Sequence, residues 1–145
     1  MQLVNIYLNF PGNADEAFRF YETVFRTRIS MRQTFGETTF ISNPPEHAKN
    51  KLMHVQLPIT ETVQLMGSDV VEGIGPGGPP LSPGNNFHVV LVANDKAEAD
   101  RTFEALSGGG GRVEMPIGNA PWGAYFGMCA DRFGIQWMVT LPTTV

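Results

Sequence analysis

One pattern of side chains occurs twice in this sequence, and the repeat restricts the possible folds. Residues 4–25 begin with alternating apolar and polar side chains, which are typical of a strand with one buried face, and continue with an apolar stripe at helical spacing. The same order returns at residues 85–106. An internal repeat of this kind indicates a duplicated supersecondary unit whose two copies share one plan.

Each predicted helix begins with a capping signal. Asn13 stands at the expected N-cap with Glu16 three residues later, and Asp95 is followed in the same way by Glu98. Behind these caps, apolar residues recur at helical spacing and predict the face that each helix lays on its own sheet. These residues are Ala17, Phe18, Tyr21, Val24 and Phe25 in the first helix, and Ala99, Phe103 and Leu106 in the second.

Short strands are expected after each helix. Alternation and turn residues place them at residues 28–33, 38–42, 53–57 and 62–66 in the first half, and at residues 112–115, 122–130 and 135–141 in the second. The sequence therefore predicts an α+β fold of two βαβββ modules in a single domain, residues 1–145, with module 1 at about residues 1–67 and module 2 at about residues 85–145. The helix of each module covers one sheet face, and the other face curves into a cup.

A segment rich in glycine and proline, at about residues 68–84, is the expected linker. It contains a GxGxxG match at residues 73–78. That fingerprint binds a pyrophosphate only when a helix starts at the glycines, and here Pro79 and Pro80 follow. The segment is therefore interpreted as a loop.

Composition excludes several classes of protein. The net charge is −4 and the basic residues are scattered, which argues against a nucleic-acid surface. No apolar run is long enough to span a bilayer, so we expect no membrane partner and a cytoplasmic protein. The one cysteine, Cys129, cannot form an internal disulfide and follows Met128 in an apolar strand, where a buried, inert thiol is expected.

Alternation also selects the side chains that face the cup. His88, near the start of the repeated strand of module 2, is the best single candidate for a metal or substrate contact, although a lone histidine on a strand is also compatible with an ordinary polar position. The face shared by His54 and Gln56 is either a second polar contact or a dimer surface. The residues expected on the cup face are Asn5, Tyr7, Asn9, His54, Gln56, Gln64, Met66, His88, Gln136 and Met138.

Four stretches carry a family resemblance. They are IYLNFPGNADEAFRFYETVF at residues 6–25, LMGSD at 65–69, KAEADRTFEALSGGG at 96–110 and WGAYFGMCADRFGIQWMV at 122–139. Together they resemble the PhnB-like branch of the vicinal oxygen chelate superfamily, which includes glyoxalase I, extradiol dioxygenases and bleomycin-resistance proteins. Some members of this branch are labelled 3-demethylubiquinone-9 3-methyltransferase, but the sequence shows no strand, glycine loop and helix that would hold S-adenosylmethionine.

The resemblance implies four metal-ligand positions, one on the first and one on the fourth strand of each module. Here they map to Asn5, Gln64, His88 and Met138, or to Trp137 if the last position slips by one residue. Two amides, one histidine and a thioether supply little charge to a divalent cation. We therefore expect no cofactor. The alternative is a divalent metal held by His88 with Gln64 and Asn5.

These observations predict a protein that binds an unidentified small molecule in the cup. Trp122 and Tyr125 are added to the ligand contacts that strand alternation predicts, because in relatives they lie near the rim of the cup. Alternation places these two side chains on opposite faces of the sheet. Two alternatives remain open. One is a metal-dependent lyase, isomerase or oxygenase with unusual ligands, and the other is a structural dimer with an empty cup. The resemblance also implies a homodimer.

Overall fold

The structure is a computed structural model that describes residues 1–74 and 80–142. The chain divides into two compact units, Met1–Ser82 and Pro83–Val145, and each contains one module. The boundary lies between Ser82 and Pro83, and the two units are described separately below. The GxGxxG match at residues 73–78 lies mostly outside the described residues.

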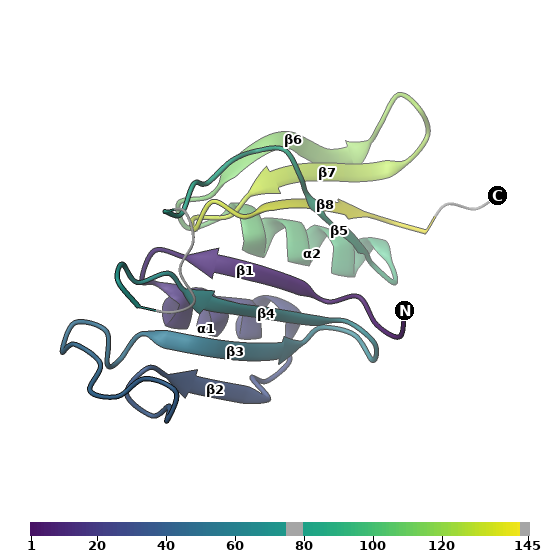
Figure 1. Ribbon diagram of the computed structural model, residues 1–145. Helices are drawn as coiled ribbons and strands as arrows, with labels where there is room; N and C mark the ends of the chain where they lie inside the picture. Colours follow the sequence, from purple (N-terminus) through teal and green to yellow (C-terminus); the bar gives the residue numbers. More distant parts are fainter. Residues whose placement is uncertain (75–79, 143–145) are drawn as a thin grey trace. The chain divides into compact units, whose positions relative to one another are not determined.

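Module 1 is a four-stranded mixed sheet with one helix on one of its faces (Figure 1). The strand order is β1-β4-β3-β2, with β1 parallel to β4 and the other pairs antiparallel. The elements are β1 (Ile6–Phe10), α1 (Ala14–Phe25), β2 (Met31–Thr34), β3 (Leu52–Pro58) and β4 (Gln64–Asp69).

Module 2 repeats this arrangement with the order β5-β8-β7-β6, and β5 is parallel to β8 (Figure 1). Its elements are β5 (Val89–Val92), α2 (Lys96–Ser107), β6 (Arg112–Asn119), β7 (Tyr125–Ala130) and β8 (Gln136–Thr140). The α+β fold of two βαβββ modules is thus confirmed, and neither sheet closes on itself. Among the described residues, both helices have 12 residues, and neither is long and apolar enough to cross a membrane.

The predicted helix stripes form the core of each module. In module 1, Phe18 and Tyr21 of α1 are fully buried and stack edge to face with ring centroids 5.6 Å apart. Gly67 in β4 lies under this stripe, because a Cβ there would be 2.7 Å from the Leu8 carbonyl oxygen and 2.9 Å from the Phe18 ring. Close helix packing therefore requires glycine at position 67, which lies within β4.

The beginning of α1 differs from the sequence prediction. Asn13 makes no side-chain capping hydrogen bond, and its buried Oδ1 has no partner. Instead Asp69, at the end of β4, accepts hydrogen bonds from the Ala14 N–H at 2.9 Å and from the Leu52 N–H at 2.8 Å. A tertiary contact has replaced the local cap. In α2, by contrast, Asp95 accepts from the Glu98 N–H at 2.8 Å, as predicted.

Two predictions about strands also differ from the structure. Residues 38–42 form bends instead of a strand, because the Gly36 N–H donates to the Lys49 carbonyl at 3.0 Å and closes residues 37–48 into a loop. In module 2, Phe87 precedes the start of β5 and is 59% exposed, so it does not belong to the buried strand face.

Candidate ligand-binding site

The helix-free sheet face of each module, here called its open face, carries most of the candidate residues. In module 1, Tyr7 and His54 contact each other: the rings are stacked with centroids 5.6 Å apart, and the phenol oxygen is 3.3 Å from His54 Nδ1. They come from β1 and β3, which β4 separates in the sheet. The structure thus brings together two residues that the sequence placed on one face.

The amides of module 1 form a second group on this open face. Gln56 Nε2 donates to Gln64 Oε1 at 3.1 Å and lies 3.5 Å from the sulfur of Met66. Asn5 Oδ1 in turn accepts from the backbone N–H of Gln64 at 3.0 Å. Asn5, which immediately precedes β1, therefore lies beside Gln64 at the start of β4.

A β-bulge changes what the open face contains. Between β2 and β3, Gln33 pairs with His54 but Thr34 pairs with Leu52, so Met53 is an extra residue in β3. Strict alternation would place Met53 and His54 on opposite faces. Instead Met53 lines a pocket together with Tyr7, and His54 contacts that same tyrosine.

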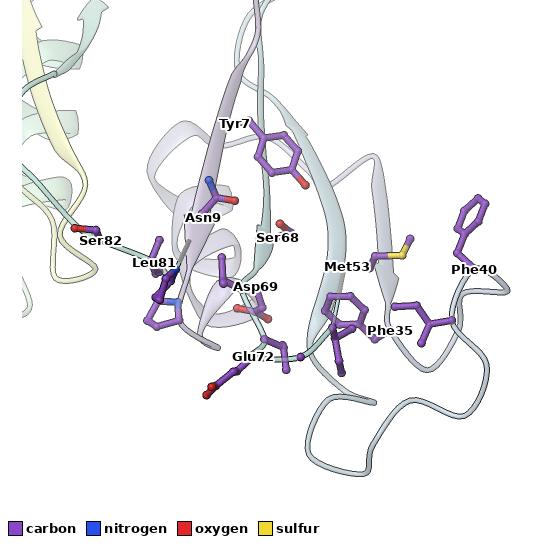
Figure 2. A pocket seen from close by; sticks show the side chains of 17 residues that line it. Tyr7, Asn9, Phe35, Phe40, Met53, Ser68, Asp69, Glu72, Leu81 and Ser82 are labelled. Atoms are coloured by element: carbon purple, nitrogen blue, oxygen red, sulfur yellow. The ribbon is translucent and has the colours of Figure 1, made fainter. Parts of the chain in front are cut away.

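That pocket lies within module 1 and has a volume of about 1500 Å³ (Figure 2). Its lining combines polar residues of the strands with mainly apolar side chains, most of them from loops. Phe40, which is 86% exposed, stands at its edge. The lining includes Tyr7, Asn9 and Ser68 from the strands and Phe35, Phe40, Ile41, Met53, Val70, Val71, Ile74 and Leu81 from the walls.

Module 2 contains a pair that the sequence analysis missed. His88 Nε2 is 3.3 Å from Glu114 Oε1, and the two side chains are only 15% and 24% exposed. Glu114 belongs to β6 and His88 immediately precedes β5, and these are the two edge strands of the sheet. Since the registers Val113↔Cys129 and Met115↔Met128 leave Glu114 as an extra residue, a bulge turns it toward His88.

Trp122 and Tyr125 make contacts with different parts of module 2, and Trp122 lies in the turn before β7. Trp122 packs against Phe126 with ring centroids 5.7 Å apart and is 63% exposed. The phenol of Tyr125 donates a hydrogen bond to Asp100 of α2, and this bond raises the pKa of the phenol. Tyr125 therefore contacts the helix side of the sheet, and its role in ligand binding stays a prediction.

The register between β5 and β8 begins at Val89, one residue after His88. Met138 pairs with Val90 and Trp137 pairs with Val89. Continuing this register by one residue places Gln136 opposite His88, and Gln136 Nε2 donates to the Phe87 carbonyl at 2.7 Å. Met138 stays on the open face but lies two residues further along, and Trp137 is fully buried against the helix side.

Comparison with known proteins identifies the family. The sequence model of the Glyoxalase/Bleomycin resistance protein/Dioxygenase superfamily matches residues 4–139. The chain belongs to this superfamily.

Individual known proteins are similar to this chain over most or all of their length. The crystal structure of protein PA1353 from Pseudomonas aeruginosa has a TM-score of 0.82 and 35% identity, covering 99% of this chain and 100% of that one. Protein YjdN from Escherichia coli is 29% identical over 93% of this chain and 92% of its own. A PhnB protein from Bacillus cereus, described as a putative 3-demethylubiquinone-9 3-methyltransferase, shares the fold with a TM-score of 0.74 at 21% identity, covering 96% and 98%.

The superfamily includes metal-dependent enzymes, so the donor groups at the four implied positions matter. Asn5 Oδ1 and Gln64 Oε1 already accept hydrogen bonds within module 1, and Met138 offers only a thioether. In module 2, His88 has Glu114 beside it, but among the described residues no three His, Cys, Asp or Glu side chains converge. This donor set does not fit a tightly held divalent cation.

The thiol of Cys129 is fully buried, and burial raises its pKa to about 12, with the carboxylate of Asp131 adding to the shift. In the unfolded chain a thiol ionises near pH ~8.5. Below that pH both states are protonated, so this thiol adds no pH dependence. As the pH rises from ~8.5 toward 12 the unfolded state loses its proton first, and stability falls.

We therefore expect the wild-type protein to lose about 2 kcal/mol more unfolding free energy than Cys129→Ala between pH 7.5 and pH 10. Urea unfolding of both proteins at the two pH values measures this difference. Parallel losses in the two proteins would contradict a strongly raised thiol pKa.

Proposed function

We propose that this protein binds a small molecule on the open face of module 1 and in the adjoining pocket, without a catalytic metal. The observation that carries the proposal is the position of Tyr7. Its ring stacks on His54 and it also lines the apolar pocket. Polar groups of defined orientation thus adjoin an apolar cavity of about 1500 Å³, which is the combination that small-molecule sites use.

The charges of the pocket further restrict the ligand. Both carboxylate oxygens of Asp69 accept backbone hydrogen bonds, so this carboxylate is already satisfied. The other polar groups in the lining are mainly neutral, with Glu72 the one further carboxylate among the described residues. A largely apolar ligand with one or two hydrogen-bonding groups suits this lining better than a phosphate or a polyanion.

The test is a thermal-shift screen of aromatic and amphiphilic molecules, followed by titration of the best ligand into His54→Ala. Ligand present at about one hundred times its Kd adds roughly 2.7 kcal/mol to wild-type stability. Loss of the His54 ring and its contact with Tyr7 should weaken binding about fivefold to tenfold. The matched control is His47→Ala, because His47 lies exposed in a loop.

Two results would contradict the proposal. Either no molecule of the screen changes the melting temperature, or His54→Ala binds the best ligand as tightly as His47→Ala does.

A metal-dependent reaction is the second candidate, and the His88–Glu114 pair favours it. A carboxylate beside an imidazole is the arrangement that orients metal-binding histidines, although here Glu114 lies beside Nε2 itself. Elemental analysis of protein purified without chelator decides between the two candidates. Near-stoichiometric zinc, manganese, nickel or iron that disappears in His88→Ala would establish the metal site and overturn the metal-free proposal.

A further inference from the structure

The pocket of module 1 has an acidic lining. Among the described residues that line it, Asp69 and Glu72 are carboxylates and none is lysine, arginine or histidine (Figure 2). Two carboxylates at −1 each, with no basic group, give the lining a formal charge of −2. A concave site of one sign concentrates ligands of the opposite sign. The lining therefore favours a cationic ligand over a neutral one, and a neutral ligand over an anion.

The two carboxylates differ in what they offer to a ligand. Asp69 is 4% exposed, and its two oxygens accept hydrogen bonds from the Ala14 and Leu52 N–H groups. Asp69 thus contributes charge to the pocket while its oxygens serve the fold. Glu72 is exposed and lines the same pocket, so its carboxylate is the one within reach of a cationic group.

Glu72 is carried by a tight turn. The Ile74 N–H donates to the Val71 carbonyl at 3.1 Å and closes a four-residue turn with Glu72 in its second position. Gly73, in the third position, has a φ of 80°, which is the value that a type II turn requires there. Val71 and Ile74 both line the pocket, so the turn holds the carboxylate between two apolar wall residues.

The rest of the lining suits the two ends of an amphiphilic molecule. Tyr7, Asn9 and Ser68 present oxygen atoms that accept hydrogen bonds, and an ammonium group is a donor only. The walls from the loops, among them Phe35 and Ile41, are apolar and suit a hydrocarbon chain. Apolar walls also reduce the screening of a charge pair beside them.

From the acidic lining, the turn and the apolar walls we infer that the ligand is an amphiphilic amine whose ammonium group pairs with Glu72. The inference rests on the proposed function, since it names the chemical class of the molecule bound in the same pocket. An alkylamine is protonated at neutral pH, because the pKa of such a group is about 10.4.

The experiment compares three probes with the same hydrocarbon chain: octylamine, 1-octanol and octanoate. Each is titrated at neutral pH into ¹⁵N-labelled protein, and binding is followed by NMR. We expect octylamine to bind about fivefold more tightly than 1-octanol and at least about tenfold more tightly than octanoate. The amide signals of Gly73 and Ile74 should move when octylamine binds.

A pair of variants separates a contact at Glu72 from the net charge of the protein. Glu72→Gln preserves the shape of an exposed side chain and removes its charge, so octylamine should bind about threefold more weakly while 1-octanol is unaffected. The control is Glu61→Gln, which makes the same change of charge at an exposed position between β3 and β4. Glu61 is not part of the pocket lining, so this variant should bind octylamine as the wild type does.

The inference fails if octylamine does not bind, if 1-octanol or octanoate binds as tightly, or if the two variants have the same effect on octylamine. These failures are distinguishable from failure of the proposed function. A ligand from the thermal-shift screen that depends on His54 but carries no cationic group would retain the proposed function and remove only the amine class.

Discussion

Asp69→Ala should lower the free energy of unfolding by about 4 kcal/mol, because two backbone N–H groups lose a charged acceptor at once. The carboxylate is 4% exposed and accepts from Ala14 N–H and Leu52 N–H, so neither donor gains water easily when the side chain is removed. Urea unfolding followed by circular dichroism measures the change.

Asp95→Ala is the matched control for this prediction. Asp95 caps α2 through the single Glu98 N–H, and its side chain is exposed, so we expect a loss of only about 1 kcal/mol. If both substitutions have equally small effects, Asp69 is not the group that joins α1, β3 and β4.

Trp137→Ala should cost about 4 kcal/mol, because it removes the largest fully buried side chain of module 2. The indole N–H also donates to Asp131 Oδ2 at 2.9 Å. The other carboxylate oxygen, Oδ1, accepts from the N–H groups of Phe133 and Ile135 and shapes the turn between β7 and β8. The substitution therefore leaves a cavity and weakens this turn.

Trp122→Ala provides the comparison for Trp137→Ala. Trp122 is 63% exposed, so its loss should change stability by less than about 1 kcal/mol. Denaturant unfolding of the two variants, with the remaining tryptophan as the fluorescent reporter, gives both values. Similar destabilisation by the two substitutions would show that Trp137 does not hold the core of module 2.

Much of the fold was predictable from the sequence because the signals were local. Period-two alternation located the strands, and apolar spacing located Phe18, Tyr21, Phe103 and Leu106 on the buried helix faces. The cap of α1 was not predictable in the same way. Asn13 has the right residue type in the right place, but Asp69, which is distant in sequence, takes the role through tertiary packing.

The candidate site was predicted less completely. Alternation correctly grouped Tyr7 with His54 and Gln56 with Gln64. It missed Met53 and Glu114, because each is the extra residue of a bulge, and a bulge breaks the alternation on which the prediction rests. The pocket was also missed, since most of its walls come from loops whose paths no periodic pattern encodes.

The bulges at Met53 and Glu114 also affect how this chain is compared with its relatives. Each bulge adds one residue to a strand. The residues before and after the bulge therefore alternate between the two sheet faces in opposite phase. An alignment that omits the extra residue at Met53 or Glu114 will match an open-face side chain in one protein to a core side chain in the other. Deletion of either residue in a relative would move the side chains of the neighbouring strand segment to the opposite face of the sheet in a single step. Relatives with nearly the same fold can therefore present very different chemistry to a ligand.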